Sequence, residues 1–377
     1  MDTQGAANYI FRKAMQFIDL KEQYKRYKSD IDARIQAVLD GGQYIMGREV
    51  AELEAALAAY VGAKHCISVS SGTHSLEIAL RALDIGTGDE VITVPFTWIS
   101  TAEAIGLVGA KPVFVDIEAD SYNIDVSQIE AAITARTKAI LPVSLFGQMP
   151  DMEAIGAIAA RHGLPVIEDA AQSFGATCNG VHSCAASQVS STSFFPAKPL
   201  GCYGDGGALF TSDDALADKI RAIRNHGGLV RHDHPLLGTN GRFDTIQAAV
   251  LLAKLPHFQW EVEERARIGA RYSELLGDVC VTPAVMPGNT HVYAQYTTRV
   301  PNRDVLAEAL KKQGIPTAVY YPKCLHEQPV FASLGYSRDS FPSSMKAAGE
   351  VISLPMHPFL SEDDQNIIVS AVRKAIT

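Results

Sequence analysis

The amino-acid sequence predicts an α/β protein with a mostly parallel β-sheet and a smaller α+β unit toward the C-terminus. Through the first two-thirds of the 377 residues, short apolar runs rich in β-branched residues alternate with longer segments of helical periodicity. This alternation is typical of strand–helix–strand units, whose parallel strands are buried on both faces. Beyond a long helical stretch at 244–277 the order becomes less regular, which indicates a separate arrangement.

Each expected strand of the sheet is an apolar run that ends at a turn before a helix. The runs of this kind are 65–70, 90–94, 111–117, 138–147 and 164–171. The helices expected between and after them are 74–83, 95–110, 125–133 and 151–163. Two later runs, "SSTSFF" (190–195) and "GGALFTS" (206–212), are expected to form a further pair of strands.

The C-terminal unit is expected from a mixture of short runs and helices. Its segments are 292–300, 303–315, 317–321 and a final helix near 363–376. Because the chain exceeds the usual length of one domain, we predict two domains, a large one at 15–260 and a small one at 261–377.

Composition excludes several classes of partner. The net charge of −9 argues against a non-specific nucleic-acid binder, which needs a basic surface. The six cysteines are scattered without a CxxC pair, which predicts free thiols in a reducing compartment and no metal site. No apolar run approaches the roughly 18 residues of a membrane span, and the N-terminus lacks the apolar core of a signal peptide. We therefore expect a cytoplasmic protein without membrane contact, for which Met15 is a candidate natural start.

Three loops are the natural places to look for a ligand. In parallel sheets, ligands bind beyond the carboxyl ends of the strands. The loops that follow expected strands there are "SSGT" (70–73), "PFTWIST" (95–101) and "EDAAQS" (168–173).

A lysine in a stiff frame is the most informative single residue. In "SFFPAKPLGCYGDGG" (193–207), Lys198 stands between Pro196 and Pro199, which fix their own φ angles. Pro199 also biases Lys198, the residue before it, toward an extended conformation. Lys198 could be a surface cation, a P-loop lysine, a general base or a lysine that bonds covalently to an aldehyde. The P-loop fails, because it needs its glycines before the lysine and a Ser or Thr directly after it.

The surrounding loops favour the covalent role. A pyridoxal 5'-phosphate (PLP) enzyme needs a lysine, a carboxylate against the pyridinium nitrogen, a phosphate cup and an aromatic face over the ring. Asp169 ends an expected strand, Thr73 begins an expected helix whose amides can hold phosphate, and Trp98 lies just beyond another strand. Each has an ordinary alternative, as a helix cap, an N-cap turn or a core residue. Their occurrence together in one sheet favours PLP.

The chain resembles the sugar-nucleotide aminotransferases of the DegT/DnrJ/EryC1/StrS family. The resemblance extends over nearly the whole chain, from "QFIDLKEQY" to "SLPMHPFL", and its most specific part is "EDAAQSFGA" followed by "SFFPAKPLGCYGDGGA". It implies the aspartate aminotransferase (type I PLP) fold. Ala197 replaces a serine that close relatives often have.

By this resemblance, Lys198 would form the Schiff base with PLP and Asp169 would pair with the pyridinium nitrogen. Lys198 and Asp169 would thus be the catalytic residues. The other residues implied to contact the cofactor are Gln172 near the phenolic oxygen, Trp98 on the ring face, and Gly72, Thr73 and Ser193 at the phosphate. Family members more often have Phe or Tyr at the position of Trp98.

The same resemblance implies an obligate homodimer with shared active sites. "GTNGRFDTIQAA" (238–249) matches a segment whose asparagine, here Asn240, reaches the phosphate in the neighbouring subunit. Arg242 would face the substrate. Tyr320 stands where many members have histidine, so the identity of the substrate is open there. His326 matches a family histidine near the active site, with substrate contact or structural packing as its alternatives.

The implied activity is transfer of an amino group from glutamate to a nucleotide-linked keto sugar in a ping-pong cycle. The resemblance is strongest to enzymes that aminate C3 of UDP-2-acetamido-3-keto-glucuronic acid in O-antigen biosynthesis. Alternatives are a dTDP-3-keto-6-deoxyhexose or a 4-keto sugar nucleotide, and a non-catalytic regulatory protein with the PLP fold. Sugar 3-dehydratases of the family carry histidine in place of the lysine, so Lys198 argues against that activity.

Overall fold

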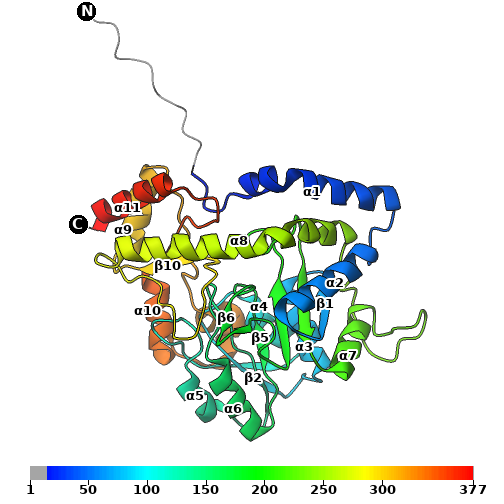
Figure 1. The fold of residues 1–377 in the computed structure, drawn as a ribbon. Helices are drawn as coiled ribbons and strands as arrows, with labels where there is room; N and C mark the ends of the chain where they lie inside the picture. Colours follow the sequence, from blue (N-terminus) through cyan, green and yellow to red (C-terminus); the bar gives the residue numbers. More distant parts are fainter. Residues whose placement is uncertain (1–14, 377) are drawn as a thin grey trace, which may run out of the picture.

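The computed structural model describes residues 15–376, in which a large sheet is covered by helices on both faces (Figure 1). The segment before Met15, the candidate natural start, lies outside the described residues. The strands of the large sheet are β1 (His65–Val69), β2 (Glu90–Thr93), β3 (Lys111–Phe114), β4 (Thr137–Ile140), β5 (Ile167–Asp169), β8 (Val189–Ser193) and β9 (Gly207–Thr211).

The strands form one continuous sheet in the order β3-β2-β4-β5-β8-β9-β1. Hydrogen bonds define the groups β3-β2-β4 and β1-β9-β8-β5, and two parallel bridges, Ile140 with Val166 and Val143 with Asp169, join β4 to β5. Every neighbouring pair is parallel except those of β9, which runs antiparallel to β8 and β1. The prediction of a mostly parallel sheet is confirmed, and the later pair of runs forms β8 and β9.

Some strands are shorter than the sequence predicted. The run 138–147 forms regular strand only to Ile140, since Pro142 has no N–H to donate to a ladder. Pairing resumes locally, where the Asp169 N–H donates to the Pro142 carbonyl at 2.9 Å. The run 317–321 makes only an isolated bridge, between Ala318 and Ser353.

Five of the α-helices begin at an Asp or Ser whose side chain caps them. Asp19, Ser71, Asp125, Asp151 and Asp213 each accept a hydrogen bond from a backbone N–H of the first turn, which satisfies a donor that the helix leaves free. The α-helices are α1 (Leu20–Gly41), α2 (Arg48–Val61), α3 (Gly72–Ala82), α4 (Ser100–Leu107), α5 (Val126–Ala132), α6 (Met152–His162), α7 (Asp214–Arg224), α8 (Thr245–Leu276), α9 (Arg303–Lys312), α10 (Pro342–Glu350) and α11 (Glu362–Ile376). Shorter elements are β6 (Thr177–Cys178), β7 (Val181–His182) and the 3-10 helices η1 (Leu325–Glu327), η2 (Pro329–Leu334) and η3 (Arg338–Ser340).

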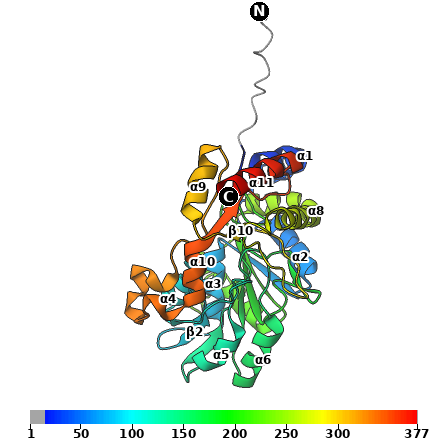
Figure 2. The ribbon, with the colours of Figure 1, turned by 90° about the vertical axis from the view of Figure 1, so that its left-hand side faces the viewer.

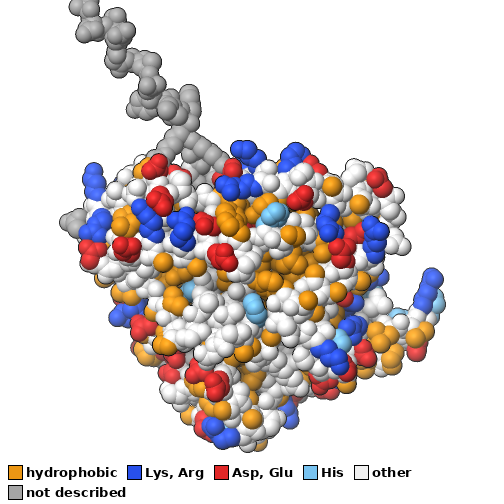
Figure 3. Space-filling view, viewed as in Figure 1, with side chains coloured by type: hydrophobic (Ala, Val, Ile, Leu, Met, Phe, Trp, Pro, Cys, Tyr) orange, Lys and Arg blue, Asp and Glu red, His pale blue; other side chains and the backbone are white. Residues whose placement is uncertain are grey.

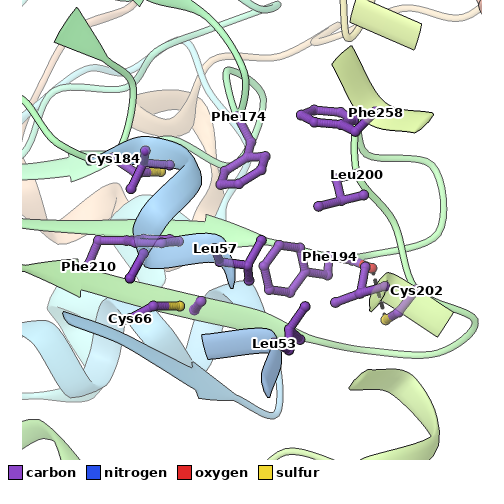
Figure 4. Packing of buried hydrophobic residues seen from close by; sticks show 14 of the residues in the cluster. Leu53, Leu57, Cys66, Phe174, Cys184, Phe194, Leu200, Cys202, Phe210 and Phe258 are labelled. Atoms are coloured by element: carbon purple, nitrogen blue, oxygen red, sulfur yellow. Dashed lines mark hydrogen bonds between the residues drawn. The ribbon is translucent and has the colours of Figure 1, made fainter. Parts of the chain in front are cut away.

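Side chains alternate between two cores on opposite faces of the sheet. Leu209 of β9 packs with residues of α3 and α7, whereas Ala208 and Phe210 pack with residues of α2 and α8. Figure 4 shows part of the second core, where Phe194 lies close to Leu57 and Phe174. Because Phe194 directly follows β8 and is fully buried, this core fixes the start of the loop that carries Lys198.

Helices α9 and α11 and strand β10 (Tyr296–Arg299) lie near the C-terminal end of α8, the longest helix, which points toward the viewer in Figure 2. Antiparallel strands β10 and β11 (Val351–Leu354) and helices α9 and α11 share a core with the second half of α8. Helix α8 runs without interruption through residues 260 and 261, so the predicted division at this point remains a prediction. The α+β character of the C-terminal unit agrees with the sequence.

Two further predictions concern the cysteines and membranes. All six cysteines are free thiols, and four of them are buried. Within residues 15–376, no helix combines the length and the apolar character needed to cross a bilayer.

Candidate active site

Four loops meet at the carboxyl edge of the large sheet. They follow β1, β2, β5 and β8, which are parallel and so end at the same edge. The loop after β8 leads into β9, and since β9 is antiparallel, this loop also stays at that edge. The three loops singled out from the sequence and the loop of Lys198 are therefore neighbours.

The first turn of α3 lies unusually close to the end of β8. A Cβ atom added to Gly72 would stand 2.6 Å from Ser193 Cβ, so only glycine fits there. The Ser71 side chain caps the helix by accepting the His74 N–H at 3.1 Å. The Thr73 hydroxyl lies 2.7 Å from that of Ser100, at the start of α4. A helix N-terminus with hydroxyls on both sides suits an anion.

Asp169, the last residue of β5, is held by a side chain and a backbone group. Its carboxylate accepts the Thr101 hydroxyl at 2.8 Å and the Ala171 N–H at 3.2 Å. Burial raises the pKa of Asp169, while Thr101, Ala171 and the positive charge of Lys198 act in the opposite direction. Only 5% of the residue is exposed.

Lys198 sits in a tight turn between β8 and β9. Its N–H donates to the Phe195 carbonyl at 2.8 Å, and the Cys202 N–H donates to the Phe194 carbonyl at 2.8 Å, which draws the ends of the turn together. Burial lowers the pKa of the Lys198 amine, and the charge of Asp169 raises it. The lysine is therefore more readily neutral, and more nucleophilic, than a lysine in water.

Tyr321 joins Gln172 and Trp98 into a second group of contacts. The Gln172 amide donates to the Tyr321 hydroxyl at 3.1 Å and accepts the Phe146 N–H at 2.9 Å. The rings of Trp98 and Tyr321 are tilted at 37° with centroids 6.0 Å apart. Trp98 is 57% exposed, so part of its ring is open to a ligand, whereas Tyr321 is partly buried, and this burial raises its pKa.

Asn240 and Arg242 lie on a separate segment. The Arg242 Nε donates to the Asn240 side-chain oxygen at 2.9 Å, and Asn240 is exposed. The Ser70 N–H donates to the Gly241 carbonyl at 3.1 Å, which brings this segment beside the loop before α3.

Tyr320 and His326, the two remaining predicted residues, have no contact with Lys198 or Asp169 among the contacts described here. Tyr320 is partly buried, with its ring centroid 5.8 Å from that of Tyr321. His326 is only 5% exposed, and its Nε2 lies 3.3 Å from the Arg338 carbonyl while its ring packs on Phe341. Substrate contact by His326 remains a prediction.

The structure brings most of the predicted residues into one connected set. Gly72 touches Ser193, and Asp169 acts electrostatically on Lys198 and on Tyr321, which bonds to Gln172 and contacts Trp98. Sequence reasoning missed Ser100, Thr101 and Tyr321. Ser100 and Thr101 lie in the loop 95–101, which the sequence already indicated, and Tyr321 follows Tyr320. Their positions next to predicted site residues could therefore have identified them.

A lysine coupled electrostatically to a buried carboxylate, at the carboxyl edge of such a sheet, is the arrangement expected of an α/β enzyme that uses PLP, the class to which aminotransferases belong. The family model of the DegT/DnrJ/EryC1/StrS aminotransferases matches residues 25–373. The chain belongs to this family.

Curated relatives and solved structures agree with this assignment. The chain is 54% identical over 95% of its length, and 99% of the relative, to a UDP-2-acetamido-2-deoxy-3-oxo-D-glucuronate aminotransferase of Pseudomonas aeruginosa. It is 50% identical over 94% of its length, and 96% of the relative, to a pleiotropic regulatory protein of Geobacillus stearothermophilus.

Two solved structures share the fold. A family aminotransferase from Brucella abortus is 46% identical with a TM-score of 0.93, covering 96% of this chain and 99% of that one. NtdA from Bacillus subtilis with bound cofactor PMP is 28% identical with a TM-score of 0.88, covering 100% of this chain and 87% of that one. The predicted fold and enzyme class are confirmed.

Proposed function

We propose that this protein uses PLP to transfer the amino group of glutamate to C3 of UDP-2-acetamido-3-keto-glucuronic acid. The observation that carries the reaction type is the pair of Lys198 and Asp169 at the carboxyl edge of the sheet. The choice of substrate is supported by the 54% identity to the Pseudomonas aeruginosa aminotransferase named for it.

The residues present fit PLP. Because Gly72 has no side chain, the N-terminus of α3 can lie against Ser193, and the Thr73 and Ser193 hydroxyls together with the helix dipole would hold the phosphate there. Asp169 would face the pyridine nitrogen, Trp98 would cover the ring and Gln172 would lie near the phenolic oxygen. When bound there, PLP supplies an electron sink for the carbanion formed at the amino donor.

In this proposal the chain supplies the nucleophile, the proton transfers and the charge balance. Lys198 Nζ would hold the cofactor through its aldehyde. Displaced by the amino group of glutamate, Nζ would take the proton from the α-carbon of glutamate and deliver it to C4′ of the cofactor, and in the second half-reaction it would move a proton from C4′ to C3 of the sugar. Thr101 and the Ala171 N–H orient the carboxylate of Asp169. The lowered pKa of Lys198 increases the fraction of free amine near neutral pH.

We further propose a homodimer in which Asn240 completes the phosphate site of the partner. The segment before Asn240 forms an arm that projects from the body of the molecule beside α7 (Figure 3). Leu229, Val230, Leu236 and Leu237 of this arm are exposed, up to 88% for Leu237. A contiguous exposed apolar surface of this kind is typical of a protein interface.

Arg242 is our candidate for reading the uronic acid. A planar guanidinium can bind the C6 carboxylate with two hydrogen bonds, a group that a 6-deoxy sugar lacks. Tyr320, beside Tyr321, would border the sugar. The alternative substrates are a dTDP-3-keto-6-deoxyhexose or a 4-keto sugar nucleotide.

A regulatory role is the second candidate, because the Geobacillus stearothermophilus relative is named a regulatory protein. The retained set of Lys198, Asp169 and their neighbours supports catalysis instead, since a binding protein has no need of a lysine with a lowered pKa.

The decisive experiment measures amino transfer from glutamate to a panel of enzymatically prepared keto-sugar nucleotides. We expect the UDP-linked 3-keto uronate to give the highest kcat/KM, with 2-oxoglutarate as co-product. A higher value for a dTDP-3-keto-6-deoxyhexose would overturn the substrate. No turnover with any nucleotide, from protein that binds PLP, would favour the regulatory role.

A further inference from the structure

One histidine joins the loop before α3 to the segment that carries Asn240 and Arg242. His74, in the first turn of α3, has its Nδ1 2.7 Å from the Ser70 hydroxyl and its Nε2 3.1 Å from the Thr239 hydroxyl. Thr239 directly precedes Asn240. A Cβ added to Gly241 would lie 3.3 Å from His74 Cε1, so the ring also packs against the backbone that follows Asn240.

The chemistry of the three side chains is matched. Burial lowers the pKa of His74, so the ring is neutral at pH 7, with one donor and one acceptor nitrogen. Each hydroxyl can donate or accept, and therefore both nitrogens can be satisfied in either tautomer. The contact links side chains that are 165 residues apart in the sequence.

Backbone bonds hold the residues on both sides of Asn240. The Thr239 N–H donates to the Ile223 carbonyl at 2.8 Å, and the Gly241 N–H donates to the Arg224 carbonyl at 2.9 Å. Both bonds run to the end of α7. The contact with His74 comes from α3, so together with the Ser70 N–H, which donates to the Gly241 carbonyl, it sets where residues 239–242 lie relative to the phosphate end of that helix.

We propose that His74 is a positioning residue that, through Thr239, fixes Asn240 and Arg242 for binding of the cofactor phosphate and the sugar nucleotide. This inference rests on the proposed function, in which Asn240 serves the partner's site. It then follows that His74 of one subunit supports catalysis at the Lys198 of the other.

Mixed dimers with one working lysine test this directly. Subunits carrying Lys198→Ala and subunits with Lys198 bear different affinity tags, so that defined hybrids can be purified. His74→Leu is placed either on the Lys198→Ala subunit or on the subunit with the working lysine. We expect the first arrangement to raise KM for the sugar nucleotide about 5- to 10-fold, the scale of one lost hydrogen bond. The second should stay near the KM of the hybrid without a His74 change. The positioning role across subunits would be overturned by an equal rise in KM in both arrangements, by no rise in either, or by a rise only in the second.

The same hybrids made with Asn240→Ala separate this inference from the shared-site proposal. If Asn240→Ala lowers activity only when it is on the subunit with the working Lys198, the shared-site proposal is wrong. The role of His74 is then tested by a double-mutant cycle. His74→Leu should add nothing to the loss caused by Asn240→Ala on the same chain, whereas fully additive losses would overturn the positioning role.

Two conservative variants and a measurement without cofactor complete the test. A glutamine side chain at position 74 can reproduce the position of Nε2 and an asparagine side chain that of Nδ1, so His74→Gln should retain function while His74→Asn should behave like His74→Leu. Thr239→Val should match His74→Leu. In cofactor-free protein, these impaired variants should speed hydrogen exchange of the Thr239 and Gly241 amides but not of amides inside α3. Unchanged exchange at 239 and 241 would contradict the inference.

Discussion

The closeness of Gly72 to Ser193 gives a sharp prediction about the phosphate end of α3. In Gly72→Ala the new Cβ would lie 2.6 Å from Ser193 Cβ and 3.2 Å from its Cα. Carbon atoms pack at about 3.5–4.0 Å, so α3 and the end of β8 must separate by about 1 Å. Such overpacking costs about 1–3 kcal/mol, which exceeds the gain of up to about 1 kcal/mol that alanine has over glycine in a helix.

We therefore expect Gly72→Ala to lower the free energy of unfolding by about 1–2 kcal/mol and to weaken PLP binding. Denaturant unfolding measures the first, and absorbance titration with PLP the second. Gly156→Ala is the matched control, because Gly156 lies in α6 with nothing within 4 Å of its added Cβ. It should stabilise the protein by about 0.5–1 kcal/mol and leave PLP binding unchanged.

A second substitution separates steric strain from lost phosphate contacts. Ser193→Gly removes the Cβ that the methyl group introduced by Gly72→Ala would meet, so the double variant should regain stability. It should not regain PLP affinity, since the Ser193 hydroxyl is also gone. A Gly72→Ala protein as stable as the wild type, with unchanged PLP affinity, would refute this reasoning.

Three further predictions concern single side chains. Asp169→Asn should bind PLP but lose at least about 100-fold in kcat, because no carboxylate then balances the pyridinium charge. This is the usual loss when one electrostatic stabiliser is removed from an active site. An unchanged kcat would remove Asp169 from the mechanism. Arg242→Ala should cost about 1.5–3 kcal/mol in kcat/KM for the uronate and far less for a neutral keto sugar with the same nucleotide, and equal losses would show that it reads something other than the carboxylate. Burial lowers the pKa of Lys254 from 10.5 to about 8. Between these values the unfolded chain binds a proton that the folded chain does not, so stability rises with pH. Relative to Lys254→Met, wild type should gain about 2–3 kcal/mol from pH 7 to pH 10 in denaturant unfolding, and parallel pH curves for the two proteins would contradict this.

The sequence predicted the sheet and the residues at its carboxyl edge because both depend on local pattern. Apolar runs gave the strands, and the two prolines singled out Lys198 as a residue in a stiff frame, although the tight turn in which the structure places it was not predicted. The family resemblance supplied the remaining residues of the site.

What the sequence did not predict are contacts between segments far apart in the chain. Thr101 and Asp169 are 68 residues apart, and Gln172 and Tyr321 are 149 apart, so no local pattern links them. The need for glycine at position 72 likewise depends on where β8 ends. Strand lengths were overestimated near Pro142, where a missing N–H interrupts an otherwise strand-like run.

The most direct test of the account is to identify the lysine that bonds to PLP. Protein loaded with PLP is reduced with borohydride, digested, and its peptides are sequenced by mass spectrometry. We predict that the cofactor is fixed to Lys198, and that Lys198→Ala protein carries none. The assignment of Lys198 as the lysine that bonds to PLP would be contradicted by label on Lys254 or any other lysine of the wild type. It would also be contradicted by the absence of label in protein that has bound PLP.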